Sequence, residues 1–364
     1  MDPQERVTSM TTPQGVHLVG SINLPDVETT MRSAAEILGR RVRRIPDGEV
    51  GERFHWIAWQ PNRLDSTDGL ERVGEPGYLV GGVLDVRPLR IADGIDALEL
   101  KLPNLGYADE ARSSWAVFKR LRDEGVIAAG TRFQVSLPTP TAVVGAFIVP
   151  EDRARFEPLY RDALFAELDR ILDVIPHDDL AIQWDCAVEF GYIENAGYDK
   201  RDNAGFLPWF DDVWSGVIAR AVEQAARVPD DVEVGFHLCY GDVGERHYVE
   251  PEDTGNLAAF AQRLLDASHR GISWIHLPVP IERDDDAYFE PLERLAVPEH
   301  TELYLGLVHR EDGAEGAERR IATAQRHVDR FGVATECGIG RAPADATLPL
   351  LRIHAAVAQP WPAL

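Results

Sequence analysis

The chain has 364 residues, 45% of them hydrophobic, and a formal net charge of −24 from 61 acidic and 37 basic residues. This length and apolar content suffice for one large α/β barrel or two medium domains. The acidic balance excludes nucleic acid and anionic membranes as expected partners, since neither tolerates such a field without a local basic patch. The sequence shows neither a membrane-spanning window nor an apolar signal core, so we expect a cytoplasmic protein.

Segments typical of strands and helices alternate along almost the whole chain. The first helix is bounded by Asp26 as a plausible N-cap and by Gly39 as a stop. The expected strands cover residues 16–22, 43–49, 133–137, 180–187, 232–242, 272–279, 303–309 and 332–339. The expected helices cover residues 26–38, 52–60, 109–124, 153–175, 208–227, a stretch from 254, a stretch ending near 330, and 344–357.

Eight strands alternating with helices predict a single (β/α)8 TIM barrel, with residues 1–364 as one domain. Residues 61–105 are irregular and punctuated by glycine and proline, which indicates a loop insertion after the second strand, with a short strand at Leu98–Leu102. The competing fold is a doubly wound open sheet. That fold usually has a glycine-rich phosphate loop after its first strand, and Val19-Gly20-Ser21 is not such a loop.

The fifth expected strand carries the pair His237 and Cys239. Side chains two apart on a strand point the same way, with α-carbons roughly 6–7 Å apart. An imidazole and a thiolate at that distance can share one tetrahedral zinc ion. The pair by itself also fits an ordinary barrel core, in which a buried cysteine lies beside a hydrogen-bonded histidine.

Further polar residues stand at the carboxyl ends of other expected strands, where TIM barrels have their active sites. They are Gly20, Ser21, Asp47, Glu49, Asp185, His276, His309 and Cys337. Two thiols and up to three imidazoles at one rim suit zinc better than other metals. With only three cysteines, Cys186, Cys239 and Cys337, the chain has no disulfide framework.

Five short segments, in this order, resemble motifs of the catalytic C-terminal barrel of cobalamin-independent methionine synthases, in the superfamily shared with uroporphyrinogen decarboxylase. The segments are Val19-Gly20-Ser21, Asp47-Gly48-Glu49 with Arg53, Ile182-Gln183-Trp184-Asp185, His237-Leu238-Cys239, and Glu336-Cys337-Gly338 with Arg341. The resemblance extends over nearly the whole chain. It is more specific for the superfamily than for the reaction.

The resemblance implies zinc as the cofactor, with His237, Cys239 and Cys337 as ligands. His276 occupies the position of the family's glutamate ligand, and we expect it to bind the metal in its place. Glu49 and Asp185 would hold the ammonium group of an amino-acid substrate. Gly20 and Ser21, with the backbone before the next helix, would hold its carboxylate. His309 matches the candidate general acid, and Asp185 is a second catalytic candidate.

The segment after the third strand departs from the family pattern. The tryptophan that packs on the folate pterin is absent there, and the nearby residues are Gly145, Ala146 and Phe147. The family's Asp-Glu-Pro-Ala segment on the fourth strand is Asp185-Cys186-Ala187-Val188 here. The thiol end of the site is thus retained, and the methyl-donor end is rebuilt.

These observations predict a zinc-dependent methyltransferase that activates a small, homocysteine-like thiol, with a methyl or alkyl donor that need not be a folate. Its partners are then small molecules, and a homodimer is left open. A demethylase, a carbon–sulfur lyase or a zinc hydrolase on the same barrel is an alternative, although thiolate ligands reduce the Lewis acidity that hydrolysis needs. A further alternative is a barrel that binds a thiol or a metal and has no catalytic activity.

Overall fold

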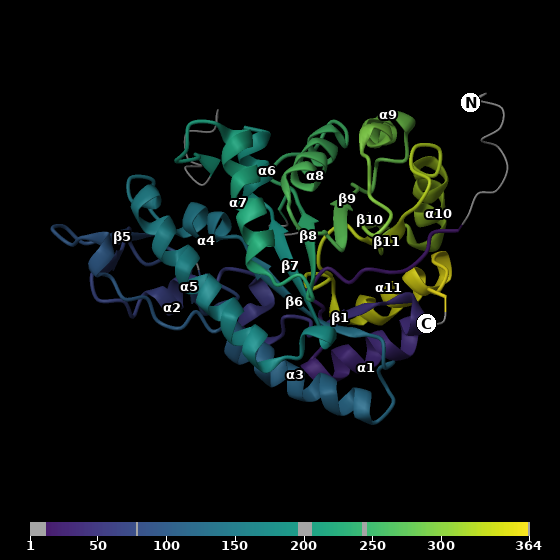
Figure 1. Ribbon diagram of the computed structural model, residues 1–364, viewed down its shortest axis with the longest axis horizontal. Helices are drawn as coiled ribbons and strands as arrows, with labels where there is room; N and C mark the ends of the chain where they lie inside the picture. The colour runs from purple at the N-terminus through teal and green to yellow at the C-terminus, as the bar shows by residue number, and fades with distance from the viewer. Residues whose placement is uncertain (1–11, 78, 196–205, 242–245, 363–364) are drawn as a thin grey trace.

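A curved sheet of seven parallel strands forms the centre of the molecule in the computed structural model, which describes residues 12–77, 79–195, 206–241 and 246–362 (Figure 1). From β6 onward, each strand pairs with the next strand along the sheet and the chain. This order, with helical crossovers, is that of a TIM-like half-barrel. The strands are β1 (Arg44–Pro46), β6 (Arg132–Pro138), β7 (Leu180–Cys186), β8 (Glu233–Leu238), β9 (Trp274–Pro278), β10 (Glu302–Val308) and β11 (Gly332–Thr335).

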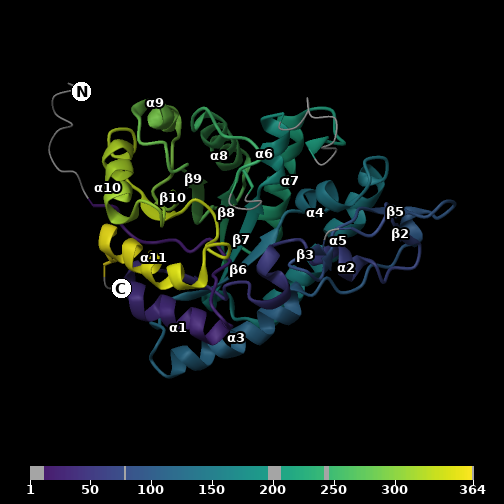
Figure 2. The ribbon, with the colours of Figure 1, turned by 180° about the vertical axis from the view of Figure 1, so that it is seen from behind.

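Helices surround the sheet (Figure 2). Contacts lead from α1 through α3, α5, α4, α6, α7 and α8 to η7, then through α9 and α10 to α11, which packs against α1 again. The α-helices are α1 (Val27–Leu38), α2 (Gln60–Leu64), α3 (Tyr107–Asp123), α4 (Pro140–Phe147), α5 (Arg153–Val174), α6 (Val188–Ile193), α7 (Val213–Arg227), α8 (Gly255–Ala267), α9 (Asp286–Phe289), α10 (Gly313–Ala324) and α11 (Ala344–Val357). The 3-10 helices are η2 (Gly39–Arg41), η3 (Gly51–His55), η4 (Ala97–Glu99), η5 (His177–Asp179) and η7 (Glu290–Arg294).

Local signals placed several elements correctly. The Asp26 side chain caps α1 by accepting from the Thr29 backbone N–H at 2.7 Å, and Gly39 ends the helix with a φ of 53°. Helix α11 has the predicted bounds. The helix expected over residues 52–60 is instead the short 3-10 helix η3 followed by α2. Of the expected fifth strand, residue 242 lies outside the described residues.

Residues 16–22, expected to form a strand, make only isolated parallel bridges. Val16 pairs with Val333 of β11, and Ser21 pairs with Gly48, which follows β1. Between these points the Leu18 and Val19 carbonyls accept hydrogen bonds from the Gln134 side chain, and the Val19 carbonyl also accepts one from Gln183. Side-chain amides thus replace the ladder bonds of a regular strand, which is why the described part of the sheet has seven strands and not eight.

The segment expected as an insertion, 61–105, contains strands that the sequence did not reveal. β2 (Leu70–Arg72) pairs with β5 (Leu89–Ile91), and β3 (Leu79–Val80) pairs with β4 (Leu84–Asp85), both antiparallel. The strand predicted at Leu98–Leu102 is wrong: the 3-10 helix η4 covers Ala97–Glu99 instead, and the Asp96 side chain caps it by accepting from the Leu98 N–H at 3.0 Å. Strands β2 and β5 lie at the end of the molecule opposite α10 (Figures 1 and 2).

A buried ion-pair cluster fills the amino-terminal end of the sheet. The Arg44 guanidinium donates to Glu233 at 2.6 Å and to Glu302 at 2.7 Å, and it lies 4.1 Å from the centre of the Trp274 ring. Arg44 is 4% exposed, so the cluster closes this end to solvent. Among the described residues, none of the helices is both long and apolar enough to cross a bilayer.

Candidate metal centre and adjoining cavities

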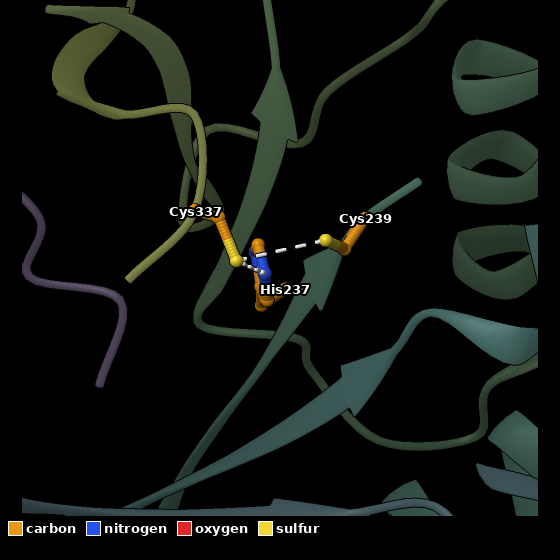
Figure 3. A group of neighbouring side chains, drawn as sticks. All are labelled: His237, Cys239 and Cys337. Atoms are coloured by element: carbon orange, nitrogen blue, oxygen red, sulfur yellow. Dashed lines mark hydrogen bonds between the residues drawn. The ribbon is translucent and has the colours of Figure 1, made fainter. Parts of the chain in front are cut away.

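Three potential metal ligands meet where β8 and β11 end (Figure 3). His237 lies in β8, Cys239 follows that strand, and Cys337 follows β11. The sulfur of Cys337 is 3.7 Å from the sulfur of Cys239 and 3.7 Å from Nε2 of His237. All three ligand atoms lie within 4.8 Å of one another. The fold therefore brings together the three residues that the resemblance implied as zinc ligands.

Two of the three separations among these atoms match those in tetrahedral zinc sites. With Zn–S bonds of about 2.3 Å and Zn–N bonds of about 2.0–2.1 Å, two ligand atoms of a tetrahedron lie roughly 3.5–3.8 Å apart. Both separations measured from Cys337 fall in this range. Two sulfur donors and one nitrogen donor are also a set that zinc favours. The donor atoms and these two separations therefore fit zinc.

Backbone and hydroxyl groups hold both cysteines in place. The Gly241 N–H donates to the sulfur of Cys239 at 3.2 Å, and Gly241 has a φ of +83°, which glycine adopts without strain. The Thr335 hydroxyl donates to the carbonyl of Cys337 at 2.6 Å. The third cysteine, Cys186, is buried at the end of β7, and burial raises its pKa well above the ordinary value.

His276 lies behind His237 and is not among the three converging residues. Its Nδ1 is 2.7 Å from Nδ1 of His237, and its Nε2 donates to the Thr335 carbonyl at 2.9 Å. Both of its nitrogens are therefore hydrogen bonded within the protein. Burial lowers the pKa of His276 to about 3, and burial with the neighbouring His276 lowers that of His237 well below its usual value. Both rings are neutral at neutral pH.

A cavity of about 50 Å³ adjoins the three ligands and also contains the residues expected to bind substrate. Its further lining includes Gly20, Ser21, Glu49, Trp56, Asp185 and Arg341. Glu49 and Trp56 have positive φ values of 51° and 53°, and they are two of the three described non-glycine residues with such values. Strained backbone conformations of this kind cluster at functional sites, where the surrounding structure maintains them because binding or catalysis requires that geometry.

Two carboxyl groups give this cavity its electrostatic character. Burial raises the pKa of Glu49 to about 7. Burial, together with the charge of Glu49, raises the pKa of Asp185 well above its ordinary value. The Gln183 amide donates to Asp185 at 2.9 Å and holds it in place. A cation in the cavity would stabilise the charged form of both carboxyl groups against burial and against their mutual repulsion. The pair is therefore suited to bind an ammonium group.

The helix N-terminus expected to hold a substrate carboxylate already has a carboxylate of its own. The Asp26 side chain accepts the Thr29 N–H at the start of α1. Ser21 lies against two glycines instead: a Cβ on Gly338 would be 2.2 Å from the Ser21 hydroxyl oxygen, and a Cβ on Gly340 would be 2.8 Å from it. Arg341, which lines the cavity, is the cationic group best placed for a carboxylate.

A second cavity, of about 170 Å³, shares Cys337 and Arg341 with the first and contains the expected proton donor, His309. Nε2 of His309 donates to the Val279 carbonyl at 2.9 Å. Burial, and then the charge of Arg320, lower the pKa of His309 to about 4. His309 is therefore neutral at neutral pH and lies in the larger cavity rather than beside the carboxyl pair.

His247 lines the same larger cavity and was not recognised in the sequence. Its two nitrogens lie 3.1 Å from carboxylate oxygens of Glu250 and Glu336. Burial lowers the pKa of His247, but the hydrogen bonds and charges of Glu336 and Glu250 outweigh burial and raise it to about 9. The sequence around His247 has no helix or strand periodicity that would indicate a site residue. The acidic Glu250, three residues later, was the only local indication of a charged partner. Trp56 was likewise missed, although it follows the motif residue Arg53.

Comparison with known proteins gives structural likeness without sequence likeness. No protein-family model matches the chain, and no curated protein matches it in sequence. A B12-independent methionine synthase from Shewanella sp. W3-18-1, solved in complex with selenomethionine, has a TM-score of 0.56 and 12% identity, covering 95% of this chain and 98% of that one. A putative vitamin-B12 independent methionine synthase from Listeria monocytogenes has a TM-score of 0.56 and 14% identity, with 96% and 98% covered.

A methyltransferase from Methanosarcina mazei is also similar, with a TM-score of 0.51 and 11% identity over 96% of this chain and 94% of that one. The similarity covers nearly the full length of each of these chains. At such low identities it establishes the shared fold, and the chemistry has to be argued from the residues of the site.

Proposed function

We propose that this protein is a zinc-dependent transferase that moves a methyl or other alkyl group onto a small amino-acid thiol of the homocysteine type. The observation that carries the proposal is that His237, Cys239 and Cys337 converge, with separations from Cys337 that match those in zinc sites. The cavity that they line also contains the carboxyl pair Glu49 and Asp185. A protein that only binds a metal or an amino acid would need just one of these two groups, the metal ligands or the carboxyl pair. A thiol-activating enzyme for an amino acid needs both at once.

Each side chain has a role in this proposal. His237, Cys239 and Cys337 would hold zinc, which when bound favours the thiolate form of a coordinated thiol. Glu49 and Asp185 bind the ammonium group, and Arg341 binds the carboxylate. These contacts would direct the substrate sulfur toward the three metal ligands that line the same cavity. Holding the reacting atom in place in this way converts binding energy into rate.

The alkyl donor would occupy the larger cavity, beyond Cys337. In the transfer, the substrate sulfur forms a bond to the donor carbon, the bond from that carbon to its leaving group breaks, and the leaving group takes the electron pair. The sequence predicted His309 as the proton donor to the leaving group. His309 is neutral at neutral pH, whereas His247 in the same cavity is protonated, so His247 is the better candidate for this role. A donor without a pterin agrees with the absence of a tryptophan from the segment after β6, residues 139–149.

The same residues bear on the alternatives. Two thiolate ligands place more negative charge on a metal than the three-histidine or histidine–carboxylate sites of zinc hydrolases, so water activation has less support. A demethylase or carbon–sulfur lyase would use the same zinc and thiol contacts in reverse. The fold proposed with this function is a complete (β/α)8 barrel, in which residues 16–22 take the first strand position through their bridges to both sides.

The test begins with zinc content by elemental analysis of the purified protein. We expect about one zinc per chain, lost in Cys239→Ser and in Cys337→Ser and kept in the control Cys186→Ala. X-ray absorption should then show one additional zinc–sulfur contact when homocysteine is added. Zinc binding without a new sulfur contact would favour hydrolysis. A protein that never binds zinc would contradict the proposal.

A further inference from the structure

The hydrogen bonds of His276 determine which of its nitrogens carries a proton. A carbonyl oxygen can only accept a hydrogen bond, so the 2.9 Å contact with the Thr335 carbonyl requires N–H at Nε2 of His276. A neutral imidazole has one N–H. His276 is fully buried, which favours the neutral ring. Its Nδ1 is therefore an acceptor.

The same logic extends to His237. Nδ1 of His276 accepts, so the 2.7 Å contact between the two Nδ1 atoms requires N–H at Nδ1 of His237. The remaining nitrogen of His237, Nε2, then has a free lone pair. This is the nitrogen that lies 3.7 Å from the sulfur of Cys337. The chain from Thr335 through His276 thus selects the tautomer of His237 that can bind a metal through Nε2.

We infer that His276 is a positioning residue that fixes the ring and tautomer of His237, and not a ligand itself. The inference rests on the proposed function, since it concerns the same zinc site. His276 has no nitrogen left for a metal while both of its hydrogen bonds are made. The centre then has three protein ligands and one open position, as catalytic zinc sites do. His237, Cys239 and Cys337 all line the cavity in which the substrate thiol would bind.

Thr335 connects this arrangement to the other side of the centre. Its carbonyl accepts from His276, and its hydroxyl donates to the carbonyl of Cys337 at 2.6 Å. One residue at the end of β11 therefore sets the position of two ligands from different strands. A shift of this strand end would move His237 and Cys337 together.

The experiment compares zinc affinity, by competition with a chromophoric chelator, in wild type and two variants. His276→Phe removes both hydrogen bonds, and we expect zinc affinity to fall about 10–100-fold. His276→Asn retains an acceptor where Nδ1 was, because its Oδ1 is also bonded to Cγ, and we expect it to recover most of the loss. His354→Phe, at a buried histidine in α11 that bonds the Leu350 carbonyl, is the matched control with unchanged affinity. Circular dichroism of the zinc-free proteins checks that each variant folds.

X-ray absorption of the zinc-loaded proteins separates positioning from ligation. We expect one imidazole and two protein sulfurs in wild type, and the same set in His276→Phe. Two imidazoles in wild type, one of them lost in His276→Phe, would make His276 a ligand and overturn the inference. A His276→Phe protein that binds zinc as tightly as wild type would also overturn it and would leave the proposed function intact. A wild type without zinc would overturn both.

Discussion

The sulfur atoms of Cys239 and Cys337 lie 3.7 Å apart although 98 residues separate them in the chain. In the sheet, strands β9 and β10 lie between β8 and β11. The cysteines still meet, because Cys239 follows the carboxyl end of β8 and Cys337 follows that of β11. The curvature of the sheet is what makes this contact geometrically possible. The proposed zinc site depends on it.

This contact predicts selective oxidation. If zinc is removed with a chelator, a mild oxidant should link Cys239 to Cys337, because the sulfurs need to approach only from 3.7 Å to about 2.0 Å. Zinc should protect both thiols. Cys186 should remain reduced, since it is buried and its pKa is raised. Peptide mapping by mass spectrometry gives the pairing, and a disulfide to Cys186 would contradict the geometry.

The raised pKa of Glu49 predicts pH-dependent binding of amino acids. The charged carboxylate attracts an ammonium group and the protonated form does not, so affinity for methionine, which has no thiol, should fall as the pH drops from 8 to 6, through the pKa of about 7. Calorimetric titration measures this slope. Glu49→Gln should bind about tenfold more weakly at pH 8, as expected for the loss of about 1.4 kcal/mol, and should lose the slope.

The control for Glu49 lies in the same turn of chain. Glu52 is in η3, and its side chain is 66% exposed. Glu52→Gln should bind methionine as wild type does at both pH values. Equal pH slopes in wild type and Glu49→Gln would show that another group controls ammonium binding.

His247 predicts a loss of stability at high pH. Its pKa is raised from 6.5 to about 9, so the folded state holds this proton more tightly than the unfolded state. The stabilisation is therefore complete below about pH 6.5 and is lost as the pH rises through 9. The groups facing the ring are Glu250, Glu336 and Tyr240. Thermal unfolding of zinc-free protein should show this decline in wild type and a smaller decline in His247→Gln.

Gly306 should be intolerant of alanine. A Cβ there would lie 2.7 Å from the α-carbon of Glu336 and 3.0 Å from the Thr335 carbonyl oxygen, both backbone atoms of the segment that leads to Cys337. Gly306→Ala should cost about 1–3 kcal/mol in the free energy of unfolding and weaken zinc binding. Gly271→Ala is the control, because its Cβ would meet only the flexible His300 side chain at 3.3 Å. Denaturant unfolding compares the two, and equal stabilities would contradict the prediction.

Local patterns in the sequence were enough for the elements that depend on neighbouring residues. Asp26 and Gly39 define the ends of α1 because capping and left-handed backbone are properties of a few consecutive residues. The strand period likewise put His237 and Cys239 on one side. Residues 16–22 were misjudged because their carbonyls bond to Gln134 and Gln183, more than a hundred residues away.

The amino-acid sequence by itself thus determined the alternation of strands and helices and the residue types of the candidate centre. Only the tertiary structure decided what His276 does. Its ring could have joined the candidate metal ligands, but the Thr335 carbonyl, 59 residues further along the chain, bonds one nitrogen, and His237 bonds the other. The physical reason is that periodicity fixes the side of a strand on which a side chain lies, whereas hydrogen-bond partners from other strands fix which atom of that side chain remains free.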